Sequence, residues 1–201
     1  MNRVKKIFSI TGLCLLFFSA CQKDDELIQS IKKQMPPATT FTNYTIRQGQ
    51  QFCDQSTFSA VEYSELEFVV KFDSSAIYTT LDPSNQYDIN KHYGFSDNNS
   101  DHQKFSARFG WRWSDKSLHI FAHVYNYSIL IWKELGTVQI GQENTCSVRV
   151  LDQQYIFSLN KITVILDRSS TTTAAVGYKL FPYFGGDELA PHDINIKIKE
   201  L

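Results

Sequence analysis

Three consecutive runs of alternating apolar and polar residues, separated by short polar turns, occupy residues 105–138. Alternation with a period of two is typical of β-strands that bury one face. A turn at residues 114–117 pairs only apolar residues across the first two strands: Trp113 with Leu118, Trp111 with Ile120, Phe109 with Ala122 and Ala107 with Val124. A slip of one residue would place arginines among these side chains, so burial fixes the register. The stretch therefore predicts a β-meander with one face in a core.

The opposite face of this meander carries polar and aromatic side chains, and a second turn at residues 127–128 brings the third strand onto it. The candidate ligand-binding residues on this face are Arg108, Arg112, His119, Phe121, His123, Tyr125, Trp132 and Glu134. Cations and aromatic rings on one surface suit a polar ligand with apolar faces. The alternative is that a loop covers this face, its charges pair across strands and its aromatic rings are buried.

The rest of the chain from residue 41 consists of short β-like runs broken by turn-forming residues, with no convincing long helical period. These runs lie at 41–47, 57–63, 66–72, 76–79, 147–151, 155–159, 161–166 and 193–199. Many short strands with frequent turns predict an all-β domain over residues 41–201, built as an antiparallel β-sandwich or barrel. Between them, residues 82–104 are rich in turn formers and predict a long polar loop.

The composition supports one folded domain and limits its partners. Hydrophobic residues make up 42% of the chain and aromatic residues 14%, which is enough for a substantial core and argues against disorder. The formal net charge is −1. A nearly neutral chain lacks the basic surface on which many nucleic-acid binders rely, so we expect no nucleic-acid partner.

The N-terminus reads as a secretory signal peptide over residues 1–20, with basic residues, a short apolar run and then small residues. Residues 18–21 resemble the lipobox of bacterial lipoproteins, which implies that Cys21 is lipidated and becomes the first residue of the mature chain. An ordinary signal peptide that leaves a free cysteine is the alternative. Residues 21–40 are polar and contain a Pro-Pro pair, so they predict a flexible tether.

The residues directly after Cys21 are Gln22, Lys23, Asp24, Asp25 and Glu26. This run resembles the short acidic signal that sends lipoproteins of the Bacteroidota phylum to the outer face of the outer membrane. The resemblance implies a lipid-anchored protein that faces the cell exterior. The alternative is a solvated charged tether.

Two cysteines, Cys53 and Cys146, remain in the predicted domain. In an oxidising location a single pair favours a disulfide. The alternative is two separate buried thiols that behave as small apolar side chains.

The sequence offers little support for a metal site or a cofactor. Asp97, Asn99 and Asp101 alternate as the first ligands of a calcium loop do, but the glycine of that loop and its final acid are missing. Solvated turn residues are the favoured interpretation. His119 and His123 would lie about 13 Å apart along a strand, too far to share a zinc ion. We expect neither metal nor organic cofactor.

The aromatic meander and the C-terminal segment PYFGGDELAPHDINIKIKEL are similar to Bacteroidota surface lipoproteins of unassigned function, and more broadly to concanavalin-A-like jelly rolls. The resemblance covers residues 90–201. It implies a curved antiparallel sandwich whose concave sheet carries a binding groove.

The first functional hypothesis is a surface module that binds a glycan through the polar face of the meander. The second is a polysaccharide lyase acting on an acidic glycan, with Arg108 or Arg112, His119 or His123, and Tyr125 or Tyr183 as the residue types that such chemistry needs. The sequence motifs of alginate-type lyases are absent, and no catalytic residue is assigned. The third is an adhesin or inhibitor that binds a host protein through residues 82–104. No Gly-x-Ser-x-Gly elbow supports a serine hydrolase.

Overall fold

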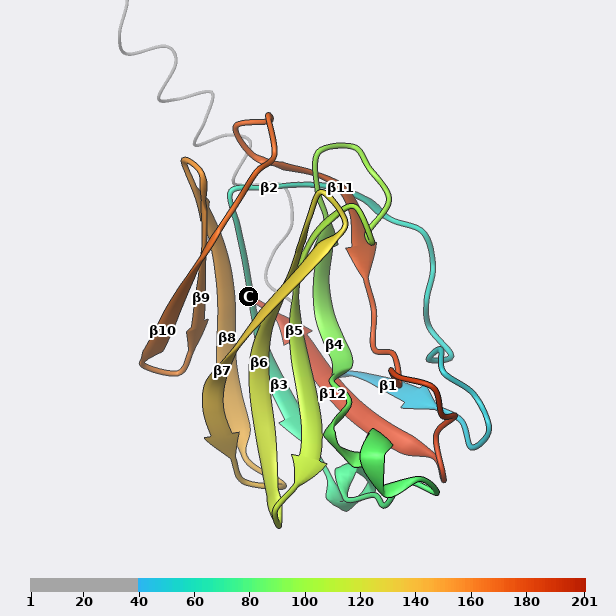
Figure 1. Cartoon of the computed structure of the whole chain (residues 1–201). Coiled ribbons are helices and arrows are strands. Elements are labelled where there is room, and N and C mark those ends of the chain that lie inside the picture. The colour runs from blue at the N-terminus through green and yellow to red at the C-terminus, as the bar shows by residue number, and fades with distance from the viewer. Residues whose placement is uncertain (1–39) are drawn as a thin grey trace, which may run out of the picture. The chain divides into compact units, whose positions relative to one another are not determined.

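Residues 40–201 are the part of the chain that the computed structural model describes, and they form two antiparallel sheets of six strands each (Figure 1). The predictions for the signal peptide, Cys21, residues 22–26 and the tether lie outside the described residues and stay predictions. No helix within residues 40–201 is long and apolar enough to cross a membrane.

The first sheet has the strand order β1-β12-β3-β8-β9-β10, and the second has the order β2-β11-β4-β5-β6-β7. The strands of the first sheet are β1 (Thr42–Ile46), β12 (Ile194–Glu200), β3 (Glu65–Phe72), β8 (Glu143–Leu151), β9 (Gln154–Leu159) and β10 (Ile162–Asp167). Those of the second are β2 (Ala60–Tyr63), β11 (Ala175–Leu180), β4 (Asn90–Ser96), β5 (Phe105–Ser114), β6 (Ser117–Asn126) and β7 (Ile129–Val138). Two short 3₁₀ helices, η1 (Ser74–Ala76) and η2 (Pro83–Tyr87), lie between β3 and β4. The all-β antiparallel sandwich is confirmed.

The meander has the predicted register. Within β5 and β6, Trp113 pairs with Leu118 and Trp111 with Ile120. The turn between these strands places Asp115 at φ 51° and its neighbour Lys116 at φ 59°. Positive φ at both central residues is the geometry of a two-residue hairpin whose twist matches its strands. The next turn, at residues 127–128, has the same geometry.

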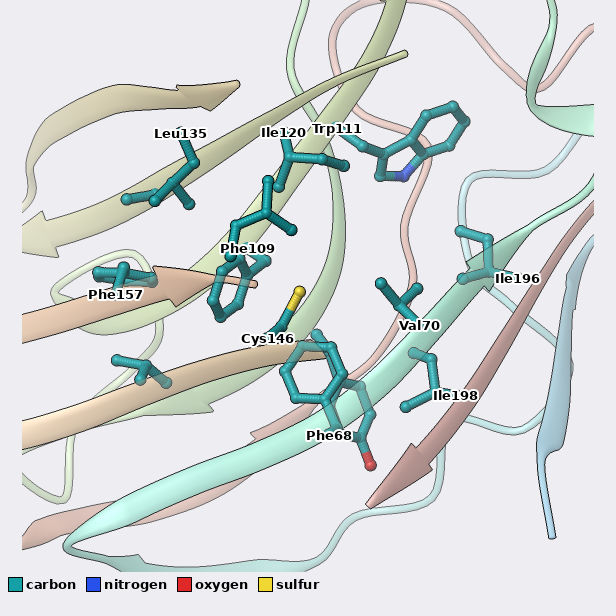
Figure 2. Packing of buried hydrophobic residues seen from close by; sticks show 14 of the residues in the cluster. Phe68, Val70, Phe109, Trp111, Ile120, Leu135, Cys146, Phe157, Ile196 and Ile198 are labelled. Atoms are coloured by element: carbon teal, nitrogen blue, oxygen red, sulfur yellow. The ribbon is translucent and has the colours of Figure 1, made fainter. Parts of the chain in front are cut away.

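The core lies between the two sheets and is built from the residues that alternate inward on each strand. Figure 2 shows Phe68 and Val70 of β3 facing Phe109 and Trp111 of β5. All four side chains are buried. The rings of Phe68 and Phe109 pack edge to face with centroids 5.5 Å apart, a favourable geometry for aromatic pairs. The inward face of the meander is therefore the core face, as the alternation predicts.

The predicted disulfide is wrong, because Cys53 and Cys146 are separate, buried free thiols. Cys146 lies on β8 in the core (Figure 2), whereas Cys53 forms an isolated β-bridge with Ile46 on the outer edge of β1. The order β1-β12-β3-β8 thus puts four strand spacings between them. At about 4.8 Å per spacing the cysteines lie roughly 19 Å apart, and a disulfide needs Cα atoms within about 7 Å.

Two sequence predictions about the strands are also wrong. Residues 76–79 form no strand, because η1 ends at Ala76, Ile77 is its cap, and the two residues after it are irregular. The predicted loop at 82–104 contains β4, which lies in the middle of the second sheet between β11 and β5. A bulge at His92 breaks the alternation of β4, since Lys91 pairs with Gly110 and Tyr93 with Phe109. His92 and Tyr93 consequently both lie in the core.

His92 is buried among phenylalanine rings, and neither ring nitrogen has a hydrogen-bond partner within residues 40–201. Burial, followed by the charge of Arg108, lowers the pKa of His92 to about 3. An unfolded histidine titrates near pH 6.5, so between about pH 6.5 and pH 3 the unfolded state binds a proton that the folded state does not. The free energy of unfolding must therefore fall as the pH falls through this window.

We expect the variant His92→Leu to lose this part of the acid sensitivity. Between pH 7 and pH 4.5, the wild type should lose about 2–3 kcal/mol more unfolding free energy than the variant, at about 1.4 kcal/mol per pH unit. Urea unfolding at both pH values measures the difference. Parallel losses in the two proteins would contradict a neutral, buried His92.

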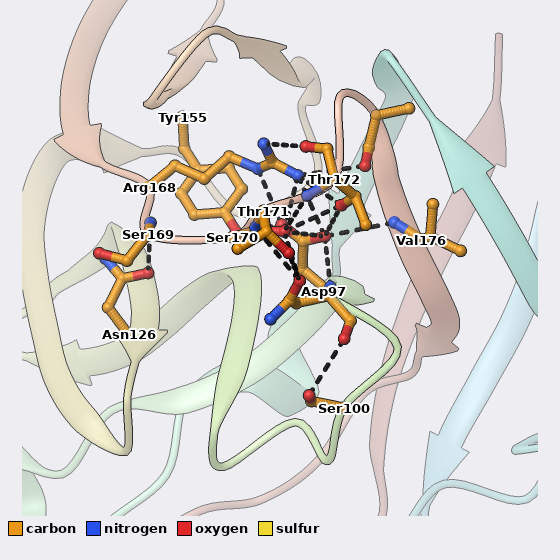
Figure 3. A network of polar contacts seen from close by, with 12 residues as sticks. Asp97, Ser100, Asn126, Tyr155, Arg168, Ser169, Ser170, Thr171, Thr172 and Val176 are labelled. Atoms are coloured by element: carbon orange, nitrogen blue, oxygen red, sulfur yellow. Dashed lines mark hydrogen bonds and ion pairs between the residues drawn. The ribbon is translucent and has the colours of Figure 1, made fainter.

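Asp97, which the sequence suggested as a solvated turn acid or calcium ligand, is fully buried in an ion pair with Arg168 (Figure 3). Arg168 Nε donates to Asp97 Oδ2 at 2.8 Å, and Arg168 also donates to the backbone oxygens of Thr172 and Ala174. Asp97 accepts further hydrogen bonds from the Tyr155 hydroxyl and the Val176 N–H. The network joins the end of β4 to β9 and to the segment between β10 and β11.

Candidate functional site

The outward face of the second sheet contains a cavity of about 400 Å³ over β4, β5, β6 and the end of β11. Three of the predicted binding residues, Arg108, His123 and Tyr125, line it, as does Tyr183. Arg108 and His123 are direct partners across β5 and β6. The remaining lining residues are Phe52, Ser56, Lys91, His102, Gln103, Ser106, Lys179, Leu180, Phe181 and Pro182.

The lining of this cavity is cationic. It contains Lys91, Arg108 and Lys179, and no aspartate or glutamate. Lys179 is neutralised, since its Nζ lies 2.6 Å from Glu200 Oε1. Within residues 40–201, Lys91 and Arg108 have no carboxylate within ion-pair distance. Arg108 therefore has no counter-ion among the described residues, and Lys91 has only the more distant charge of Asp88.

Several buried polar atoms around the cavity lack a hydrogen-bond partner in the described part of the chain. They are Arg108 Nε, His123 Nδ1 and Ser106 Oγ. Arg108 makes one hydrogen bond there, from Nη2 to the Phe181 carbonyl at 2.8 Å. A buried polar group without a partner costs about 1–3 kcal/mol. Three such groups around one cavity are the arrangement expected of a site that a polar ligand completes.

Burial shifts the protonation of these groups, and their mutual repulsion adds to the shift. Burial lowers the pKa of Arg108 to about 10. The pKa of Lys91 falls to about 8, first because of burial and then because of the charge of Arg108. Burial, with Lys91 and Arg108 nearby, lowers the pKa of His123 to about 3. At neutral pH the site therefore presents two cations and a neutral imidazole that can both donate and accept a hydrogen bond.

A second cavity of about 230 Å³ adjoins the first, and Lys91 and His123 line both. Trp132, a predicted binding residue, lines this second cavity and is 51% exposed. The Trp132 ring packs edge to face on Phe121, with centroids 5.7 Å apart. The other lining residues are Tyr87, Asp88, Ile89, Leu130 and Gly186.

Three predicted binding residues lie outside both cavities and interact with other protein groups instead: Arg112, His119 and Glu134. Arg112 Nη1 donates to the Tyr87 carbonyl at 3.0 Å, and its guanidinium lies over the Tyr87 and Phe121 rings. His119 Nδ1 lies 2.7 Å from Glu134 Oε1. In this half of the face the alternative holds: Tyr87 covers Arg112, and His119 pairs with Glu134 across the strands.

Phe121 is fully buried beneath Arg112 and beside Trp132. A ring with no exposed surface cannot stack on a ligand, so the expected ligand contact there is corrected to a supporting role. Trp132 keeps the exposed aromatic surface of this region.

The sequence reasoning missed Lys91, Ser106 and Phe52. Ser106 alternates with Arg108 on β5, so the same period of two already placed it on this face. Lys91 required β4 to be recognised despite its bulge. Phe52 lies in an irregular segment after β1 and carries no periodic signal.

The described residues offer no obvious metal centre: no group of three or more His, Cys, Asp or Glu side chains that could hold a metal occurs among residues 40–201. The groups that line the cavities are cations, imidazoles, hydroxyls, aromatic rings and, in the smaller cavity, the Asp88 carboxylate. Such groups bind and orient a polar ligand, and some can transfer a proton.

Comparison of sequences finds no matching protein-family model and no similar curated protein. Comparison of structures finds similar folds. An endo-glucanase of glycoside hydrolase family 16 from Bacteroides ovatus, solved in complex with G4G3G-2F-DNP, has a TM-score of 0.53 at 14% identity, covering 80% of each chain.

The alginate lyase AlyC3 has a TM-score of 0.51 at 10% identity, covering 79% of this chain and 72% of the lyase. Another family 16 protein, from a Bacteroides ovatus mixed-linkage glucan locus, has a TM-score of 0.52 at 14% identity, covering 83% of this chain and 84% of that protein. At such identities the likeness shows a shared jelly-roll sandwich.

Proposed function

We propose that this chain is a glycan-binding β-sandwich protein and that the larger cavity takes an acidic saccharide. The observation that carries the proposal is the set of unpaired buried groups around Arg108, together with two cations that make no ion pair within the described chain. A uronate supplies a carboxylate for the cations and hydroxyls that donate and accept for His123 and Ser106. Arg108 uses only one of its N–H donors within the described chain, and the planar guanidinium matches the geometry of a carboxylate.

The similar folds support a saccharide over other polar ligands. AlyC3 has also been solved in complex with dimannuronate, with a TM-score of 0.50 at 9% identity over 79% of this chain and 71% of the lyase. A sandwich of this kind can therefore hold an acidic sugar. The N-terminal pattern adds a location to the proposal: lipid on Cys21 and the acidic run at residues 22–26 would hold the domain outside the outer membrane, where glycans or host surface molecules are met.

A lyase is the second candidate, because Arg108, His123, Tyr125 and Tyr183 meet in one cavity. In such a reaction Arg108 would hold the uronate carboxylate, a base would remove the C5 proton, and the C4–O bond would break as the leaving oxygen is protonated. His123 stays neutral at working pH and could accept a proton. Tyr183 is less suited to protonate the leaving oxygen, because its hydroxyl already donates to Gln51 Oε1 at 2.7 Å.

Two other functions, glycoside hydrolysis and host-protein binding, have less support. Glycoside hydrolysis of the usual kind needs two carboxyl groups beside the bond to be cleaved. The larger cavity has none among the described residues, and the smaller has only Asp88. The host-protein hypothesis relied on a long free loop at 82–104, and β4 occupies the middle of that segment.

An array of acidic and neutral polysaccharides, probed with the purified protein, tests the proposal. We expect binding to acidic members without any rise in the ultraviolet absorbance of unsaturated uronate products. Binding with rising absorbance would replace capture by lyase activity. Binding to neutral glycans alone would contradict an acidic ligand.

The affinity for an acidic saccharide should depend on the charge of Lys91. Because the pKa of Lys91 is about 8, Lys91 is mostly protonated at pH 7 and mostly neutral at pH 9. We expect the association constant to fall about tenfold between these pH values, the loss of one charge-assisted contact. The variant Lys91→Met should bind more weakly at pH 7 and show a flat profile. Isothermal titration measures both, and an equal decline in the two proteins would remove Lys91 from the site.

A further inference from the structure

The two cavities on the outward face differ in charge although they share a wall. Lys91 and His123 line both cavities. The larger continues to Arg108, whereas the smaller continues to Trp132 and the carboxylate of Asp88. The two cavities are therefore neighbours on one face, with Lys91 and His123 between them.

We infer that the ligand is an oligosaccharide that occupies both cavities at once, with a uronate in the Arg108 cavity linked to a neutral or amino sugar over Trp132. This inference rests on the proposed function and names its substrate class: an acidic glycan in which uronates alternate with hexosamines or neutral hexoses. A glycan made only of uronates fits one cavity and is disfavoured in the other.

Asp88 is the group that sets this preference. It lies at the end of η2, half-buried, and makes no ion pair within residues 40–201. Lys91 is the cation that lines this cavity beside Asp88, so a second uronate there would share Lys91 with Asp88 and with the first uronate, which is unfavourable compared with a neutral unit. A hydroxyl, an N-acetyl N–H or an ammonium group would instead donate to Asp88.

Trp132 provides the apolar contact. Its ring is half exposed, is supported edge-on by Phe121 and lies across from His123 on the neighbouring strand. The C–H face of a sugar ring packs on such a surface, while a neighbouring unit places its carboxylate by Arg108. His123 is 2% exposed with Nδ1 unpaired in the described chain, and it lies where the linkage between the two units would pass.

The test compares three probes by isothermal titration with the purified protein: a hyaluronan tetrasaccharide, an oligomannuronate of four units and free glucuronate. We expect the hyaluronan fragment to bind at least about tenfold more tightly than the oligomannuronate. Trp132→Ala should weaken the hyaluronan fragment about tenfold and leave glucuronate unchanged, since stacking on an aromatic ring is lost only for the second unit. Asp88→Asn should tighten oligomannuronate and reduce the discrimination.

The outcomes separate this inference from the function on which it rests. Equal affinity for both tetrasaccharides, with no effect of Trp132→Ala or Asp88→Asn, would overturn the two-cavity ligand while leaving an acidic saccharide site intact. Absence of binding by all three acidic probes would overturn both. Thermal unfolding of the two variants, each changed at a partly exposed side chain, confirms that they are folded.

Discussion

Replacing Asp97 with alanine is expected to lower the free energy of unfolding by about 3–5 kcal/mol, because it leaves the buried charge of Arg168 without its partner. Both side chains of this ion pair are fully buried, and Asp97 also accepts from Tyr155 and Val176. The loss would loosen the end of β4 from β9 and from the segment before β11. Urea unfolding of wild type and variant measures the change.

The exposed ion pair between Arg47 and Asp193 is a matched control. Its nitrogen and oxygen lie 2.7 Å apart, about as close as the buried pair, but the two side chains are 62% and 45% exposed to solvent. Such surface pairs contribute little to stability. Asp193→Ala should therefore change the unfolding midpoint far less than Asp97→Ala. Equal effects of the two substitutions would contradict the assigned role of burial.

Replacing Arg108 with glutamine is expected to weaken the binding of an acidic saccharide by about 100-fold. The substitution removes a buried cation and its charge-assisted hydrogen bonds, which are the strong kind in a site of low polarity. It also removes the donor to the Phe181 carbonyl, so unfolding measurements must accompany the titrations. Isothermal titration with the tightest acidic ligand from the array provides the affinity.

Arg112→Gln is the control for this prediction, because Arg112 lies on the same strand and the same face as Arg108 but outside both cavities. Its guanidinium is held by Tyr87 and Phe121. We expect the affinity of Arg112→Gln for the acidic saccharide to stay within about twofold of the wild-type affinity. A larger loss at Arg112 than at Arg108 would move the site to the other half of the face.

The sequence was sufficient for the fold class and for the register of the meander, because strict alternation leaves one pairing that buries only apolar residues. It was not sufficient for β4. There a bulge at His92 puts two successive side chains inward, so a strand in the middle of a sheet resembles a polar loop. Local periodicity cannot reveal a strand whose period is interrupted.

The candidate site was predicted as a face but not as a cavity. Alternation correctly placed Arg108 and Arg112 on one surface. Which arginine is available to a ligand depends on Tyr87, whose carbonyl and ring both contact Arg112 from a distant part of the chain. The expectation of a solvated Asp97 was wrong because its partner is Arg168, 71 residues away. The predicted disulfide was wrong because the strand order, which the sequence does not give, separates Cys53 from Cys146.

The central claim is that the cavity beside Arg108 recognises the negative charge of a saccharide, and a matched pair of ligands tests it most directly. The pair is an acidic oligosaccharide that binds on the array and the same oligosaccharide with its carboxyl groups reduced to alcohols. Ring structure and hydroxyl pattern are then nearly unchanged, and only the charge is lost. The account predicts that reduction weakens binding by about 100-fold in isothermal titration. Equal affinity for the two ligands would contradict it.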